Sequence, residues 1–144
     1  DVHDPMRLAY DYSGNVIRPM TLVFVKERSE EAIRQAILNQ LTVAWFNGHL
    51  AGSEKLLGQL FDKSVSIQKV ATTKGKTKYL VSNLTDFTIH CQGLSADWNG
   101  KLELAPRSAV TITVPETATN INLEVTNWHT GMINNLQLTW NLNQ

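Results

Sequence analysis

The sequence has 144 residues, 42% hydrophobic and 18% charged, a balance typical of one ordinary folded domain or two small ones. Thirteen basic residues balance thirteen acidic ones, so the chain has no net field to attract nucleic acid or anionic lipid. No apolar run approaches the roughly 20 residues needed to cross a bilayer, and the first residues lack the pattern of a signal peptide.

A carboxylate and an imidazole stand two residues apart at the start of the chain, as Asp1 and His3. In an extended segment these positions project to the same side, and oxygen and nitrogen ligands together suit zinc, manganese or iron. A frayed chain terminus without any metal-binding role can show the same Asp-x-His spacing. Asp11 and Arg18 follow in a long polar connection. They are candidates for a loop that contacts substrate, in which the Arg18 guanidinium would bind a phosphate group through two hydrogen bonds. A solvent-exposed loop without such a role is the commoner outcome.

Strand and helix patterns alternate between residues 21 and 63. The apolar run 21–25 is typical of a strand covered on both faces. Ser29 and Ser53 are placed to cap two helices with apolar stripes, and the run 42–46 between them predicts a second strand that ends at Asn47-Gly48. This alternation predicts α/β packing. Two strands cannot stabilise such a sheet alone, so we expect most of it to lie upstream of Asp1.

After residue 64 the hydrophobic period changes from helical spacing to two. Around seven short strands separated by turn signals indicate a β-sandwich of immunoglobulin-like type; their apolar residues include Val65, Ile67, Tyr79, Val81, Ile89, Cys91, Leu102, Leu104, Ile112, Ile121, Leu123, Leu136 and Leu138. The cysteine pair of antibody domains is absent. No flexible linker separates the two parts, so we expect them to be packed together.

Four other residues are candidate functional groups. Cys91, the single cysteine, alternates with apolar residues and is interpreted as a small buried hydrophobe rather than a nucleophile. His49 is expected in a turn between strand and helix. Trp98 and Trp128 are expected near loops, where exposed rings could stack on sugars, although a place at the edge of the core is the commoner role.

Several segments together resemble the end of the catalytic domain in bacterial PHP-type (polymerase and histidinol phosphatase) phosphoesterases that carry an extra C-terminal β domain. The segments are Asp-Val-His-Asp-Pro at 1–5, Tyr-Asp-Tyr at 10–12, Arg-Pro-Met-Thr-Leu-Val-Phe-Val-Lys at 18–26, Ser-Glu-Glu-Ala-Ile-Arg at 29–34 and Thr-Val-Ala-Trp-Phe at 42–46. The resemblance covers residues 1–63 well. Beyond residue 63 it extends only to a similar β tail in the same place.

The resemblance implies a distorted (β/α) barrel whose last metal motif, Asp-x-His, falls on Asp1 and His3. Both would then bind divalent ions (zinc, manganese or iron) in a full-length parent, and the helix after Ser29 and the strand around Val43 would close the barrel. The other ligands of that site are not in this sequence. A hydrolytic metal site needs several ligands and a position for water, so we expect no firmly bound metal and no catalysis by this chain alone.

The expected fold class is α+β: residues 1–63 as the end of a PHP-like catalytic domain and residues 64–144 as an immunoglobulin-like accessory domain. The expected partners are the upstream part of the same polypeptide and a phosphate-ester substrate of the parent. The alternative is a carbohydrate- or surface-binding β-sandwich without catalysis. The compartment stays open, with a periplasmic or secreted location slightly favoured.

Overall fold

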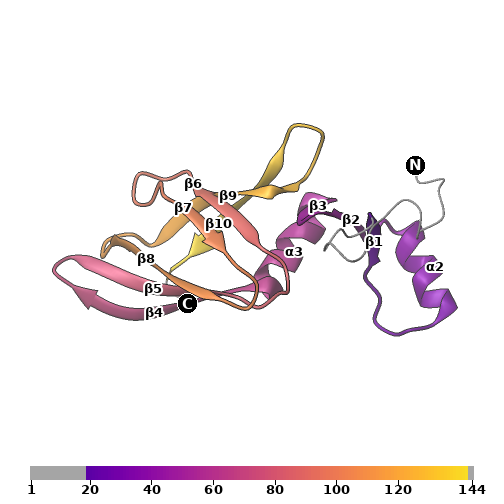
Figure 1. Cartoon of the computed structure of the whole chain (residues 1–144), viewed down its shortest axis with the longest axis horizontal. Helices are drawn as coiled ribbons and strands as arrows, with labels where there is room; N and C mark the ends of the chain where they lie inside the picture. The colour runs from indigo at the N-terminus through magenta and orange to yellow at the C-terminus, as the bar shows by residue number, and fades with distance from the viewer. Residues whose placement is uncertain (1–18, 143–144) are drawn as a thin grey trace, which may run out of the picture.

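The structure, a computed structural model, describes residues 19–142, and Figure 1 shows its elements in chain order. They are β1 (Met20–Val23), α2 (Glu30–Leu38), β2 (Thr42–Phe46), β3 (His49–Gly52), α3 (Glu54–Ser64), β4 (Val65–Thr73), β5 (Lys76–Asn83), β6 (Ile89–Gly93), β7 (Lys101–Leu104), β8 (Ala109–Pro115), β9 (Asn120–His129) and β10 (Asn135–Asn141). None of the helices in this part of the chain is long and apolar enough to span a membrane.

The strands form two sheets. Seven of them make one sheet in the order β1-β2-β3-β9-β6-β7, with β10 also paired to β9, and β4, β5 and β8 make the second. The strands that follow α3 pair antiparallel within each sheet. This two-sheet arrangement is consistent with the β-sandwich that the period of two predicts.

The first three strands form an antiparallel meander, which differs from the α/β packing predicted for this region. β1 pairs with β2 and β2 with β3, both antiparallel. The β2–β3 hairpin turns at Asn47 and Gly48, with φ values of 48° and 77°, the positive pair that an Asn-Gly type I′ turn requires. The strand/helix alternation of the sequence concealed β3, because His-Leu-Ala-Gly carries too few β-forming residues to indicate a strand.

β1 is an edge strand whose side chains are exposed or half-buried, so within residues 19–142 it is not covered on both faces, which corrects the interpretation of residues 21–25. It pairs with β2 on one side and ends the sheet on the other. Met20 is 41% exposed and Val25, beyond the strand, is 36% exposed. Within residues 19–142 no element covers the outer side of this edge, so the apolar run lacks the cover that its composition predicts.

Both helices begin as the sequence predicts. The Ser29 hydroxyl accepts a hydrogen bond from the Ala32 amide at 3.2 Å, and the Ser53 hydroxyl accepts one from the Leu56 amide at 3.4 Å. Each cap satisfies one amide of the first helical turn that has no partner within the helix. The two serines therefore locate both helix starts correctly.

One hydrophobic core runs across residue 64, where the two predicted domains meet. Phe61 of α3 is fully buried; its ring lies 5.7 Å from that of Trp128 on β9 and 5.7 Å from that of Trp140 on β10. β3 also pairs with β9, in the parallel sense, at Leu50↔Trp128 and Ala51↔His129. The division at residue 63 stays a prediction, and within the described chain the two parts are packed together.

A buried asparagine reinforces the junction between β3 and the rest of the sheet. The Asn127 amide donates to the carbonyl oxygens of Gly48 and Thr88 at 2.7 and 3.0 Å, and its side-chain oxygen accepts from the His90 amide at 3.0 Å. A buried amide is tolerated only when its donors and acceptor are satisfied. Asn127 thus ties the β2–β3 turn to β6.

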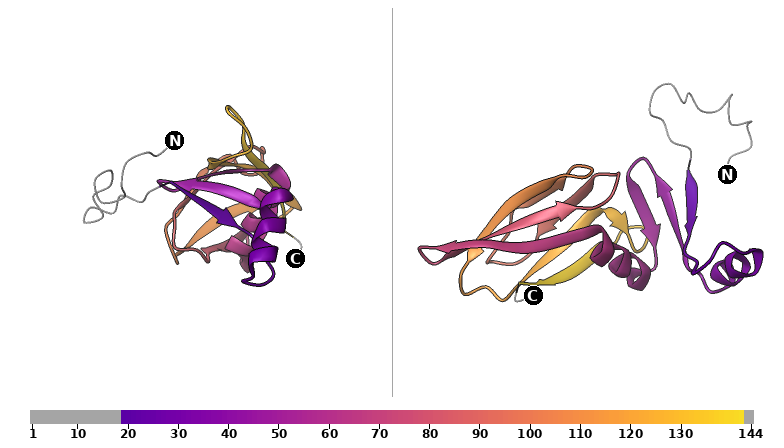
Figure 2. Two further views of the ribbon diagram at one scale, coloured as in Figure 1. Left: turned by 90° about the vertical axis from the view of Figure 1, so that its right-hand side faces the viewer. Right: turned by 90° about the horizontal axis from the view of Figure 1, so that it is seen from below.

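Figure 2 shows how these elements are arranged along the molecule. The strands that follow α3 lie toward one end, α3 lies between them and the first strands, and β1 and α2 occupy the opposite end. α2 is therefore remote from the core around Phe61.

Candidate functional site

The predicted metal ligands and substrate-loop residues lie outside the residues that the structure describes. Asp1, His3, Asp11 and Arg18 all precede residue 19, where the described chain starts. From residue 19 to residue 142, no group of three or more histidine, cysteine or acidic side chains could hold a metal ion. The metal site therefore stays a prediction from the resemblance, and no catalytic step is derived from the described residues.

The two tryptophans of the binding alternative occupy different environments. Trp128 lies in β9 and is fully buried, between Phe61 and Phe87, whose ring centre is 6.2 Å away. Trp128 therefore presents no ring face to a ligand, which corrects its expected place near a loop. Trp98 lies in a turn and is partly buried against the core. A side chain at Gly93 would collide with the backbone and ring of Trp98, so Gly93 makes room for this turn.

Cys91 is buried in β6, as its alternation with apolar residues predicts. Burial raises the pKa of its thiol to about 12, because an apolar surrounding penalises the charged thiolate. The thiolate is the nucleophilic form of cysteine. Cys91 is therefore a small hydrophobe of the core and not an activated nucleophile.

Two histidines far apart in the sequence meet beside the β3–β9 junction. The Nδ1 atom of His49 lies 2.9 Å from the Nε2 atom of His129, the ring centres are 5.2 Å apart and the planes differ by 5°. The distance between the ring centres exceeds the distance between the two nitrogens by about two imidazole ring radii, so both nitrogens lie on the line that joins the ring centres. The two rings therefore lie edge to edge in one plane and are not stacked face to face. This is the geometry of an N–H···N hydrogen bond.

Asn135 sets the direction of this hydrogen bond. Its side-chain oxygen lies 2.9 Å from Nδ1 of His129. A carbonyl oxygen only accepts, so His129 carries its hydrogen on Nδ1, and its Nε2 accepts from Nδ1–H of His49. The chain of three side chains links β3, β9 and β10. No sequence signal could have identified it, because 80 residues separate the two histidines.

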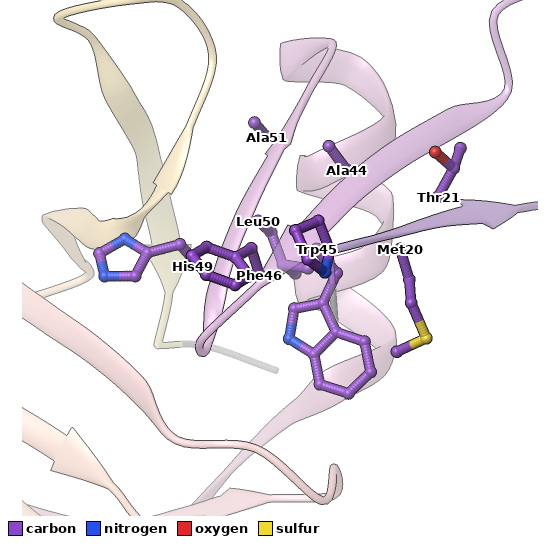
Figure 3. Close-up of a pocket in the computed structure, with 9 residues that line it drawn as sticks. Met20, Thr21, Ala44, Trp45, Phe46, His49, Leu50 and Ala51 are labelled. Carbon is purple, nitrogen blue, oxygen red and sulfur yellow. The ribbon is translucent and has the colours of Figure 1, made fainter. Parts of the chain in front are cut away.

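A shallow apolar hollow of about 260 Å³ lies along β1, β2 and β3 (Figure 3). It is lined by Pro19, Met20, Thr21, Ala44, Trp45, Phe46, His49, Leu50 and Ala51. Figure 3 shows Met20 and Trp45 reaching to the same side of the strands. The lining contains no lysine or arginine, the side chains that bind phosphate oxygens best. Its chemistry suits contact with apolar protein groups better than contact with a phosphate ester.

The clearest unpartnered feature is the apolar side of α2. Ala36 is the one buried residue in this helix, whereas Ile33 is 43% exposed and Ile37 is 55% exposed. Helical spacing places these residues on one stripe, which normally faces a core. Within residues 19–142, the Ala36 end of this stripe is buried, whereas Ile33 and Ile37 stay largely uncovered.

The described chain therefore combines two largely antiparallel sheets, a three-stranded meander at its start and a helix with exposed apolar side chains. Among solved structures, the chain is similar to a two-domain protein from Bacteroides vulgatus that contains a predicted PHP-like metal-dependent phosphoesterase. The identity is 30% and the TM-score 0.86, over 99% of this chain. This likeness confirms the resemblance that the sequence indicates.

The match covers less than half of the Bacteroides protein. This chain spans 44% of the Bacteroides protein, so activity, substrate and metal content of that whole protein are not established for this chain. No family model matches the chain, and no curated protein matches it.

Proposed function

We propose that this chain is the C-terminal part of a metal-dependent PHP-type phosphoesterase. In this proposal, residues 1–63 contribute the last elements of the catalytic domain, and the immunoglobulin-like strands that follow form an accessory domain that supports it. Asp1 and His3 are the contribution of this chain to the metal site. The observation that carries the proposal is the likeness to the two-domain PHP-like protein, which extends over 99% of this chain.

We assign different roles to the strands after residue 64 and to the upstream polypeptide because a metal-dependent hydrolase needs side chains that these strands do not present. The described strands after residue 64 hold a buried, inert thiol and buried aromatic rings, which are properties of a supporting core. Hydrolysis of a phosphate ester by a metal site requires several ligands and an activated water. We assign the remaining ligands to the upstream part of the longer polypeptide. The carbohydrate-binding alternative loses one of its two candidate rings, because Trp128 is buried, and keeps only the partly buried Trp98.

The experiment compares the longer polypeptide with this chain. Each is assayed with bis(p-nitrophenyl) phosphate, a diester, and p-nitrophenyl phosphate, a monoester, after loading with zinc, manganese or iron(II). We expect hydrolysis by the longer protein, loss of it with a chelator, and none by this chain alone. Absence of hydrolysis of either ester by the folded, metal-loaded longer protein would overturn the proposal. The ratio of the two rates assigns diester or monoester chemistry.

A further inference from the structure

His49 and His129 project from the same face of the larger sheet. β3 runs parallel to β9, with Leu50 opposite Trp128 and Ala51 opposite His129. Leu50 and Trp128 are fully buried. Because successive side chains of a strand point to opposite faces, Ala51 and His129 face away from that core, and His49, two residues before Ala51, faces away with them. The pairing of β3 with β9 therefore holds the two imidazoles beside each other.

Asn135 determines which nitrogen of His129 is able to bind a metal ion. Its side-chain oxygen accepts from Nδ1–H of His129 at 2.9 Å, so the in-plane lone pair of this imidazole lies on Nε2. A histidine that binds a metal ion almost always donates its other ring N–H to an oxygen acceptor, because this hydrogen bond orients the ring and makes the ligating nitrogen more basic. His129 therefore has the orientation and the outer hydrogen bond of a metal ligand, and its Nε2 points toward Nδ1 of His49.

His49 is placed to supply the second nitrogen once its ring turns. Two nitrogens bonded to one ion at about 2.0–2.1 Å lie roughly 2.8–3.4 Å apart, for bond angles between those of a square-planar and a tetrahedral site. The observed distance of 2.9 Å falls in this range. The two lone pairs must converge on the ion instead of facing along one line, and the exposed side chain of His49 has the freedom to turn. Its proton moves from Nδ1 to Nε2 by exchange with water, so both rings bind as neutral imidazoles.

We propose that His49 and His129 form a binding site for one divalent copper, nickel or zinc ion, with water at its remaining positions. Imidazole nitrogens suit these ions, whereas magnesium and calcium prefer carboxylate and carbonyl oxygens. Within residues 19–142 no third histidine, cysteine or acidic side chain completes the site, so the ion keeps open positions and exchanges, unlike the ion of a closed structural centre. The site uses neither Asp1 nor His3 and does not depend on the proposed phosphoesterase activity.

An ion at this place ties the first three strands to the rest of the sheet. The parallel pairing of β3 with β9 covers two residue pairs, and Asn127 adds a hydrogen bond to the β2–β3 turn. An ion that binds only the folded chain shifts the folding equilibrium by a factor of 1 + [ion]/Kd, which is roughly 100-fold at 100 times Kd. The expected consequence is a more stable junction between β3 and β9.

Isothermal titration calorimetry with copper(II), nickel(II) and zinc(II) salts tests the site. The titrations are made at about pH 7.5, where an ordinary histidine is mostly neutral. Every protein carries His3→Gln, because His3 is the other histidine that we propose as a metal ligand. We expect one ion per chain, with copper(II) bound most tightly, since nitrogen sites follow that order of affinity.

Matched substitutions separate the two proposed ligands from histidine elsewhere in the chain. His49→Gln and His129→Gln each remove one ligating nitrogen and are expected to weaken binding by roughly tenfold or more. His90→Gln is the control: it removes the same side chain from β6, where Nδ1 of His90 lies 3.9 Å from Glu103, and it should leave the affinity unchanged. His49 is exposed, so His49→Gln is expected to stay folded, which far-UV circular dichroism checks.

Pulsed electron paramagnetic resonance of the copper(II) complex counts the imidazoles that bind the ion. We expect coupling to two imidazoles in the His3→Gln chain and to one after His49→Gln. Hydrogen exchange supplies a second measurement: saturating zinc(II) should slow exchange of the amides of residues 49–52 by roughly tenfold or more, because the ion holds β3 against β9. His49→Gln should abolish this protection.

Three results would overturn the inference. One is the lack of saturable binding of any of the three ions below about 1 mM. A second is an affinity and a number of coupled imidazoles that stay the same in the folded His49→Gln and His129→Gln variants. A third is a loss of affinity after His90→Gln as large as that after His49→Gln, which would show that the ion binds surface histidines without preference. None of these measurements uses ester hydrolysis, so failure of the metal site and failure of the proposed activity are distinguishable.

Discussion

Replacing Phe61 with alanine tests whether residues before and after residue 64 share one core. Phe61 is fully buried, and its ring contacts Trp128 and Trp140 from the two strands at the end of the chain. A buried Phe→Ala change costs about 3–5 kcal/mol, and tilted or edge-on aromatic pairs contribute about 0.5–1.5 kcal/mol of that. At an m value of about 2 kcal/mol per M, a loss of about 4 kcal/mol lowers the urea midpoint by roughly 2 M.

The assay is equilibrium unfolding in urea, followed by tryptophan fluorescence and by far-UV circular dichroism. One transition is expected for the parent and for Phe61→Ala, with both probes moving together. Ile37→Ala is the matched control: this side chain is 55% exposed, so its loss should change the free energy of unfolding by less than about 0.5 kcal/mol. A Phe61→Ala loss below about 1 kcal/mol, or a transition that splits in two, would refute the reasoning.

Further predictions concern polar groups and the thiol. Asn127→Ala removes three hydrogen bonds, among them that to Gly48, and is expected to lower the free energy of unfolding by about 2–3 kcal/mol in urea titration; an unchanged midpoint would contradict its bridging role. Cys91 should stay unreactive toward a disulfide reagent in mildly alkaline buffer until the protein is unfolded, because its pKa is raised to about 12; rapid labelling of the native protein would show that it is accessible. The Arg107 guanidinium lowers the pKa of the exposed Asp86 carboxyl by hydrogen bonding and charge. The stabilisation by this pair is therefore present above the ordinary aspartate value of 3.8 and is lost as the pH falls through the lowered pKa. Asp86→Asn should reduce the acid dependence of the thermal midpoint slightly, and less so at about 1 M salt; an equal acid dependence with and without the carboxylate would contradict the assignment.

The strands after residue 64 could be predicted because each obeys a local rule. In β9, the residues from Asn120 to Val125 alternate between more exposed and buried positions, and in β5 the pattern from Lys76 to Asn83 alternates in the same way. One solvated face per strand imposes a period of two on the sequence. The helix starts at Ser29 and Ser53 are equally local, since a cap and its first turn lie within about four residues.

The features that could not be predicted from the sequence depend on contacts between segments that are far apart in the chain. The edge-to-edge pair of His49 and His129 arises from the parallel pairing of β3 with β9, which no spacing in the sequence encodes. The adjacent His129 favours a loop around Trp128. In the structure Asn127 is buried and fully engaged with backbone groups, so the strand continues through it and Trp128 enters the core.

The candidate site likewise contains one feature that local sequence spacing predicts and others that it does not. The stripe of Ile33 and Ile37 follows from helical spacing, but whether a stripe is covered depends on what lies beside it, and in the described chain these two side chains stay largely uncovered. The Asp-x-His motif at residues 1 and 3 gains its meaning from the resemblance alone. Its role in metal binding therefore stays a prediction.

The role of this chain in a metal-dependent phosphoesterase is tested most directly by substituting the two proposed ligands in the longer polypeptide. Asp1→Asn and His3→Asn are each compared with the parent for bound metal, by elemental analysis, and for turnover of bis(p-nitrophenyl) phosphate. We expect each variant to remain folded, to bind less metal, and to lose turnover by roughly tenfold or more. Full metal content and full turnover in both folded variants would contradict the proposal.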